Sequence, residues 1–244
     1  MKPFLLVSTR PEEEALDSEY QAYKKAAKLS PEDLELAEFD LLGLPPLDFQ
    51  DYSGVFVAGS PYGAAPGTGH LSQREQSVRE QLTTRLKEVL EADVPLLVTG
   101  NAMNILTQIL GGEVAADDPG LSEITDIELT RKALEDPLVG DSPEVFPAFV
   151  NHSELVVEVP QGAVRLARSL NSPVEIYRVG DRTYAVKFNP ELDAEAIRTQ
   201  AQAHADAGYS GMADLEASVV IGRHGSGDHA AARILSNFAE HFRQ

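Results

Sequence analysis

The chain has 244 residues and a formal net charge of −19, and its 43% hydrophobic and 24% charged residues are ordinary globular proportions. The acidic balance opposes binding to phosphate backbones and anionic membranes, so we expect neither a nucleic acid nor a membrane partner. The chain has no cysteine, which excludes disulfides, thiolate metal sites and a cysteine nucleophile. It shows neither a basic-then-apolar leader nor an apolar run of about 18 residues, which predicts a cytoplasmic protein.

The first hundred residues alternate predicted strands with predicted helices. Residues 3–8 form an apolar run the length of a buried strand, and residues 34–42 predict a second strand, ended by Gly-Leu-Pro-Pro. Between them, residues 12–28 combine charges with apolar positions at helical spacing, which predicts a surface helix with an acidic first turn. A capping box at Ser72 begins a long helix to residue 91. This order predicts right-handed crossovers and a parallel sheet.

A strand at residues 52–57 ends in the small-residue turn Gly59-Ser60-Pro61. Taken alone, such a turn usually has no function. The glycine-rich segment at 63–69 lacks the Gly-Lys-Ser/Thr ending of a nucleotide-binding P-loop, so we expect no nucleotide cofactor there.

The most informative stretch is residues 94–112. An apolar strand at 94–98 turns sharply at Thr99-Gly100-Asn101-Ala102 and continues into a helix whose apolar residues recur at spacings of three and four. Enzymes of the α/β class mount a nucleophile at such a turn, where the helix N-terminus directs free N–H groups at a developing oxyanion. Here that position is Gly100, which has no side chain.

The second half of the chain predicts strands at 124–130 and 155–159, and a hairpin of strands 174–179 and 182–188 joined by Gly-Asp. Helices are predicted at 194–207 and near 230–242. His224, Asp228 and His229 lie in a glycine-containing segment rather than on one helix face, so we expect no metal. The whole chain, residues 1–244, is predicted to be a single α/β domain with a central, mostly parallel sheet flanked by helices.

The stretch around Gly100 resembles the nucleophile turn of class I glutamine amidotransferases, in particular the GMP synthase-like, actinobacterial branch. Counting forward from Pro95 or backward from Gly112 places the family's cysteine at Gly100 in both cases. The turn at Gly59-Ser60 is similar to the family loop that donates a backbone N–H to the oxyanion hole. The resemblance extends over nearly the whole chain and implies a flavodoxin-like fold.

The same resemblance identifies the remaining positions of the family's catalytic triad. The segment Phe188-Asn189-Pro190-Glu191 is similar to the family's Phe-His-Pro-Glu, so the base position is Asn189 and the orienting acid is Glu191. An asparagine does not titrate and a glycine offers no nucleophile, so the reactive pair is missing. The resemblance therefore implies a degenerate member without glutaminase activity, which needs no cofactor.

Six residues are candidates for binding a ligand in the inherited pocket: Gly59, Ser60, Asn101, His152, Ser153 and Lys187. His152-Ser153 resembles a segment that borders the family's glutamine pocket, although a lone histidine is more often structural. Lys187 lies two residues before Asn189 on one strand, so both face the same side. It could pair with Glu191 and plug the pocket or bind an anionic ligand, although a solvated lysine is the more common outcome.

Three hypotheses follow. The first is an inactive amidotransferase-like protein that binds a glutamine-like or anionic ligand, a protein partner or a second copy of itself. The second is an enzyme of altered chemistry, with Glu191 activating the hydroxyl of Thr99 or Ser60, which requires a carboxylate of raised pKa within hydrogen-bond reach of a hydroxyl. The third is a non-catalytic scaffold subunit whose pocket is filled.

Overall fold

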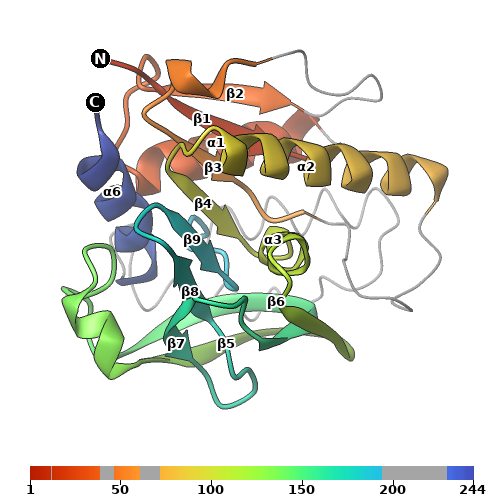
Figure 1. Ribbon diagram of the computed structural model, residues 1–244, viewed down its shortest axis with the longest axis vertical. Helices are drawn as coiled ribbons and strands as arrows, with labels where there is room; N and C mark the ends of the chain where they lie inside the picture. Colours follow the sequence, from red (N-terminus) through yellow and green to blue (C-terminus); the bar gives the residue numbers. More distant parts are fainter. Residues whose placement is uncertain (12, 39–46, 61–71, 194–229) are drawn as a thin grey trace.

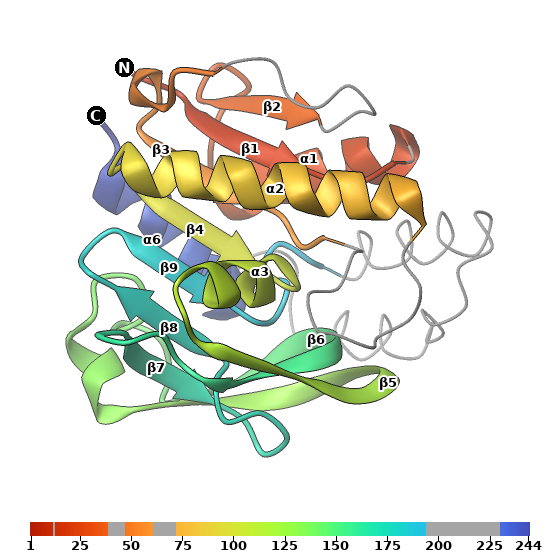
Figure 2. The same cartoon turned by 45° about the vertical axis from the view of Figure 1, so that its right-hand side comes forward.

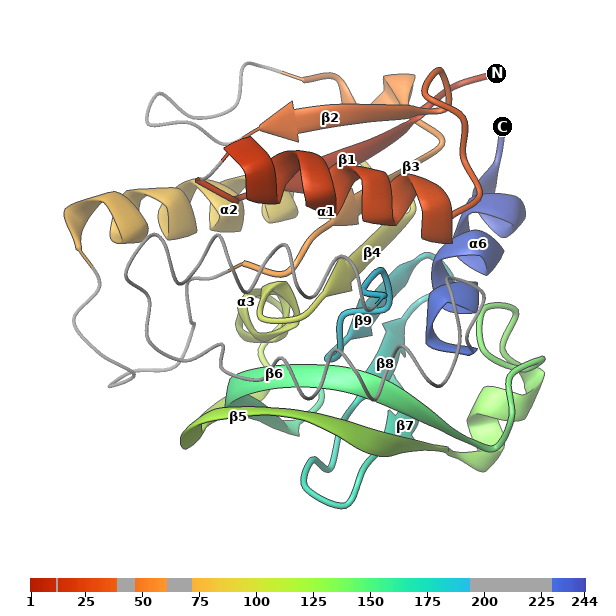
Figure 3. The same ribbon diagram turned by 180° about the vertical axis from the view of Figure 1, so that it is seen from behind.

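The computed structural model describes residues 1–11, 13–38, 47–60, 72–193 and 230–244. Within these residues, nine strands form one mixed sheet in the order β2-β1-β3-β4-β9-β8-β7-β5-β6, with helices on both faces (Figures 1 and 3). The strands are β1 (Phe4–Ser8), β2 (Leu34–Glu38), β3 (Gly54–Val57), β4 (Leu96–Thr99), β5 (Glu113–Leu129), β6 (Val145–Glu158), β7 (Val164–Arg168), β8 (Ile176–Val179) and β9 (Thr183–Val186). The helices are α1 (Glu13–Ala26), α2 (Gln73–Glu91), α3 (Ala102–Ile109) and α6 (Ala230–Phe242), with 3-10 turns at Phe49–Asp51 and Arg131–Glu135.

Five neighbouring strands of the sheet, in the order β2-β1-β3-β4-β9, pair in parallel. Because both faces of this half are covered, β1, β3 and β4 are buried along their whole length, as their continuous apolar sequences predict. Helices α1 and α6 pack on one face around Phe56 and Phe238, and α2 and α3 pack on the other around Val98 and Leu106. The carboxyl ends of β1, β3, β4 and β9 therefore meet at one edge of the sheet.

The other half of the sheet is antiparallel. Strand β8 pairs with β9 and β7, and β7 pairs with the end of β5. Strands β5 and β6 form a long hairpin at the edge of the sheet opposite β2 (Figure 2). The 3-10 turn Arg131–Glu135 follows β5 directly and lies beside β7.

Most predicted elements are confirmed, and the main differences lie in the antiparallel half. The strands predicted at 124–130 and 155–159 are parts of the much longer β5 and β6. Strand β7 was not predicted, because Val-Arg-Leu-Ala-Arg is short and carries two charges. The predicted helix at 194–207, residues 39–42 of the second strand, and His224, Asp228 and His229 lie outside the described residues.

None of the helices in the described part of the chain is both long enough and apolar enough to cross a membrane. The same part contains no group of three or more histidine, aspartate or glutamate residues arranged to hold a metal ion.

Candidate functional site

The turn between β4 and α3 has the backbone of a nucleophile turn. Gly100 has φ +55, in the left-handed region that favours glycine. The Asn101 side chain makes no capping hydrogen bond to the first turn of α3. The geometry predicted for residues 94–110 is therefore present, with a glycine at its strained position.

The space next to Gly100 is occupied by the amide of Asn189. A Cβ atom built on Gly100 would lie 2.8 Å from Oδ1 of Asn189 and 3.1 Å from Cα of Gly59. A Cβ built on Gly59 would likewise lie 2.9 Å from the same Oδ1. The structure thus brings together three positions predicted from separate motifs, and it packs them so closely that no side chain fits at Gly100 without a shift.

Glu191 is buried but does not hold Asn189 in place. Neither of its carboxylate oxygens accepts a hydrogen bond of normal geometry from the described residues. Burial raises the pKa of Glu191 to about 8, and the charge of Glu19 adds to the rise; its own backbone N–H and Arg10 oppose it by less. A triad acid orients its base through a hydrogen bond, and Glu191 makes no such bond to Asn189 in the described structure.

A buried polar cluster surrounds Glu191 on the α1 side of the sheet. Glu19 accepts hydrogen bonds from the Ser8 hydroxyl and, at 2.8 Å, from Nε of Arg10. The hydroxyls of Tyr23 and Thr99 lie 2.6 Å apart. Burial raises the pKa of Tyr23 well above its usual value, and the charges of Glu191 and Glu19 add to it.

This cluster bears directly on the altered-chemistry hypothesis. Glu191 has the raised pKa that such chemistry requires, but no hydroxyl of the described residues lies within hydrogen-bond reach of it. The Thr99 hydroxyl is instead paired with Tyr23. Ser60 is also buried, and its hydroxyl makes no hydrogen bond to Glu191. The geometric condition of that hypothesis is therefore not met.

Sequence reasoning missed Ser8, Arg10, Glu19 and Tyr23 as neighbours of the site. Glu19 resembles one more acid of a charged surface helix. It nevertheless lies four residues after Ala15 and four before Tyr23, and α1 buries all three on one face. That helical spacing was the available signal for a buried acid.

On the opposite, α3 side of the turn, Lys187 is buried rather than solvated, with only 1% of its surface exposed. Its Nζ lies 3.4 Å from Oδ1 of Asn101 and 3.5 Å from Oδ1 of Asn104, both at the start of α3. Asn104 in turn donates from Nδ2 to Glu154 at 2.9 Å. The common outcome for such a lysine is therefore wrong here, and its amine is directed at the turn rather than hydrogen-bonded to Glu191.

The structure gives fewer contacts for the remaining candidate residues. His152 and Ser153 lie in β6, where His152 is paired with Leu121 across the hairpin, and their roles stay predictions. Gly59 and Asn101 line the turn at Gly100 through the contacts described above.

Comparison with known sequences places relatives of the chain among GMP synthases, although no family model matches it. It is 36% identical over 106 residues to a glutamine-hydrolyzing GMP synthase subunit of Haloquadratum walsbyi, a match that covers 43% of this chain and 56% of that protein. It is 34% identical over 106 residues to the glutamine-hydrolyzing GMP synthase of Lactobacillus delbrueckii subsp. bulgaricus, covering 43% of this chain and 20% of that protein. The matches thus span between a fifth and just over half of these relatives.

Solved structures with a similar fold include glutamine amidotransferases. The enzyme from Thermotoga maritima superimposes with a TM-score of 0.74 at 15% identity over 100% of both chains. The glutamine amido transferase of Methylobacillus flagellatus gives a TM-score of 0.69 at 15% identity, covering 98% of this chain and 95% of that one. The predicted flavodoxin-like fold and the resemblance to class I glutamine amidotransferases are confirmed.

Proposed function

We propose that this chain, a relative of the class I glutamine amidotransferases, does not hydrolyse glutamine and acts by binding a ligand or a protein partner. The observation that carries the proposal is the contact between Gly100 and Asn189. The position that holds the nucleophile in the family has no side chain, and the amide of Asn189 fills the adjacent space. The reaction needs a nucleophile and a proton acceptor, and these two residues supply neither.

The state of Glu191 supports the same proposal. Without a histidine at residue 189, the carboxyl group has no base to orient, and burial raises its pKa to about 8. In a serine protease without its triad, the oxyanion hole and binding alone accelerate the reaction by on the order of 10³–10⁴ over the rate in water. An acceleration of that size is too small for a working glutaminase.

Two features support binding as the retained role. The amides of Asn101 and Asn104 and the ammonium of Lys187 lie together at the start of α3. Asn104 and Lys187 are buried and Asn101 is partly exposed, so a glutamine-like or anionic ligand would contact Asn101, with the charge of Lys187 behind it. The relative from Haloquadratum walsbyi is named as one subunit of a GMP synthase, which supports a protein partner for this chain.

The test is a paired assay on the purified protein. We expect no release of ammonia from glutamine above a blank, with the Thermotoga maritima amidotransferase as positive control. Thermal shift with glutamine and glutamate is expected to raise the Tm, and Lys187→Met is expected to abolish that rise, while the matched exposed change Lys87→Met on α2 leaves it intact. Ammonia release that survives purification and disappears in Glu191→Gln would overturn the proposal, and a Tm that neither compound shifts would remove its small-ligand part.

A further inference from the structure

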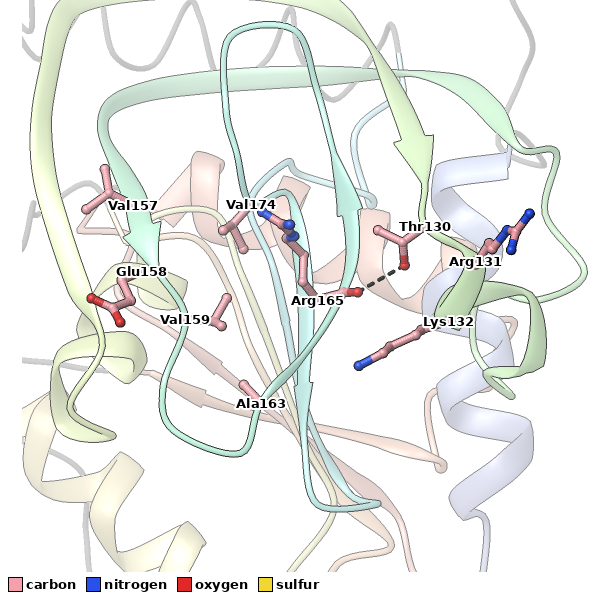
Figure 4. Close-up of a pocket in the computed structure, with 9 residues that line it drawn as sticks. All are labelled: Thr130, Arg131, Lys132, Val157, Glu158, Val159, Ala163, Arg165 and Val174. Atoms are coloured by element: carbon pink, nitrogen blue, oxygen red, sulfur yellow. Dashed lines mark hydrogen bonds between the residues drawn. The ribbon is translucent and has the colours of Figure 1, made fainter.

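Polar groups away from the α3 side of the turn differ in how far their neighbours balance them. In a hollow of about 520 Å³ on the antiparallel half, the amine of Lys132 points inward, with the carboxylate of Glu158 across from it (Figure 4). There the Thr130 hydroxyl donates to the carbonyl oxygen of Arg165 at 3.0 Å. The carboxyl group of Glu191 is different, because it is only 4% exposed and neither of its oxygens has a hydrogen-bond partner among the described residues.

Three charged or titratable side chains lie around Glu191 on the α1 side. Arg10 follows β1, and Glu19 and Tyr23 come from α1. Nε of Arg10 already donates to Glu19 at 2.8 Å, and the charge of Arg10 lowers the pKa of Glu191 by less than burial raises it. The charge of Glu191 raises the pKa of Tyr23 by more than the charge of Glu19 does, so the Tyr23 hydroxyl and the Glu191 carboxyl interact at short range.

The other charged groups near this segment are paired or lie on the opposite side of the turn. Lys25, in the last turn of α1, forms an ion pair with Asp193 at 2.6 Å, two residues after Glu191. Lys187 lies on the α3 side, with its amine directed at the start of that helix. In the described part of the chain, the charged and titratable donors that remain for an ionised Glu191 are therefore those of Arg10 and Tyr23.

Glu191 is connected to the turn at Gly100 in two ways. Through side chains, the Tyr23 hydroxyl lies 2.6 Å from that of Thr99, a buried residue that directly precedes Gly100. Through the backbone, Asn189 lies two residues before Glu191, and its Oδ1 would be 2.8 Å from a Cβ on Gly100. Both connections end at a glycine, where the backbone moves more readily than at other residues.

We propose that Glu191 is a proton-operated switch for the turn at Gly100. In the protonated form its carboxyl carries no charge, and Tyr23 stays paired with Thr99. Loss of the proton to solvent leaves a buried negative charge, and a hydrogen bond to a charged acceptor is about twice as strong as one between neutral groups. The Tyr23 hydroxyl then turns from Thr99 to the carboxylate, and the segment 189–191 shifts against Gly100. The switch concerns the turn itself, so it depends neither on a ligand nor on the absence of glutaminase activity.

The test is nuclear magnetic resonance of the full chain, labelled with carbon-13 at glycine Cα and threonine methyl groups, from about pH 6 to 10. We expect Gly100 and Thr99 to titrate together with a midpoint near 8, the pKa to which burial raises Glu191. Both titrations are expected to disappear in Glu191→Gln, whose amide does not ionise. The matched control Glu240→Gln, at an exposed position of α6, is expected to keep both.

Chemical shifts also report a nearby charge, so the movement is measured separately. The nuclear Overhauser contact between the Tyr23 ring and the Thr99 methyl group is expected to weaken as the pH rises through the midpoint. The same contact in Glu191→Gln is expected to stay constant over that range.

A second pair of variants tests Tyr23 as the donor. Tyr23→Phe removes a hydrogen bond from the charged form of Glu191, so the midpoint at Gly100 is expected to rise by about one pH unit. Tyr20→Phe is the matched control on the same helix, because the Tyr20 hydroxyl donates to the carbonyl oxygen of Leu34 at 3.1 Å, and it is expected to leave the midpoint in place.

Four results would overturn the proposal. They are a Gly100 signal that does not titrate in the wild type, a titration that survives in Glu191→Gln, a Tyr23–Thr99 contact of equal strength at both ends of the pH range, and a midpoint that Tyr23→Phe leaves as unchanged as Tyr20→Phe does. Circular dichroism melts confirm that each variant is folded. If Glu191→Gln does not fold, the wild-type contact and the two tyrosine variants still decide.

Discussion

The two sides of the turn at Gly100 differ in how their polar groups are satisfied. On the α3 side, Lys187 approaches the amide oxygens of Asn101 and Asn104, and Asn104 donates to Glu154. On the α1 side, Glu191 is buried beside the Arg10–Glu19 pair, and its two oxygens lack hydrogen-bond partners among the described residues.

This difference is what we expect around a site that has lost its catalytic pair, as we propose for this chain. Groups on the α3 side form polar contacts with each other, so that side gains rigidity without a substrate. The carboxyl group of Glu191 on the α1 side, which we propose to be the family's orienting acid, has no hydrogen-bond partner among the described residues. A buried carboxyl without a partner is stabilised by taking up a proton, which agrees with the direction of its pKa shift. Changes of charge or pH on the α1 side should therefore alter the free energy of unfolding more than changes on the α3 side.

The largest expected effect is the loss of Arg10 from the α1 side. Arg10→Met leaves Glu19 buried without its cation and with the carboxyl of Glu191 nearby, so we expect a loss of about 3–5 kcal/mol in the free energy of unfolding. The matched control is Arg168→Met, which breaks an exposed pair with Glu128 at 2.9 Å and should cost about 0–1 kcal/mol. Urea denaturation measures both. Similar losses for the two variants would contradict the view that the α1 cluster depends on its charge balance.

The next effect concerns the packing of Gly100 against Asn189. Gly100→Ala is expected to cost about 2–4 kcal/mol, because a Cβ there meets both an unfavourable φ and an oxygen at 2.8 Å. Gly180→Ala is the matched control, since Gly180 has φ +58 but nothing within 4 Å of its Cβ, and should cost only the backbone part of about 1–2 kcal/mol.

A double-mutant cycle in urea isolates the contact itself. In an Asn189→Ala background, which removes Oδ1, the cost of Gly100→Ala is expected to fall toward that of Gly180→Ala. An unchanged cost would mean that Asn189 does not fill the space beside Gly100.

Contacts that follow from the order of the strands could be predicted from the sequence, whereas contacts that depend on how helices pack could not. The closeness of Gly59, Gly100 and Asn189 could be predicted, because each follows a parallel strand whose carboxyl end lies at the same edge of the sheet. Strand alternation predicted that Lys187 and Asn189 face the same side, but β9 ends at Val186, before both residues. The burial of Lys187 could not be predicted, because it depends on the groups that α3 brings to it. The Arg10–Glu19 pair was missed because its contact depends on how α1 packs against β1 and not on a local motif.

The sharpest test of the contrast is the pH dependence that Glu191 imposes, an effect that is small at pH 5 and grows with pH. Its pKa is raised from 4.5 to about 8 in the folded chain, so the folded state binds its proton more tightly than the unfolded state. The resulting stability is fully present below pH 4.5 and is lost as the pH rises through about 8. We expect Glu191→Gln to be near neutral at pH 5 and to stabilise the protein by up to about 4 kcal/mol relative to the wild type above pH 8, since each pH unit between the two pKa values costs the wild type about 1.4 kcal/mol and an amide carries no buried charge. Urea denaturation from pH 5 to 9 measures this, with Glu240→Gln at an exposed position of α6 as control. Parallel pH profiles for wild type and Glu191→Gln would show that the acid is paired after all, and that the two sides of the turn are equally well satisfied.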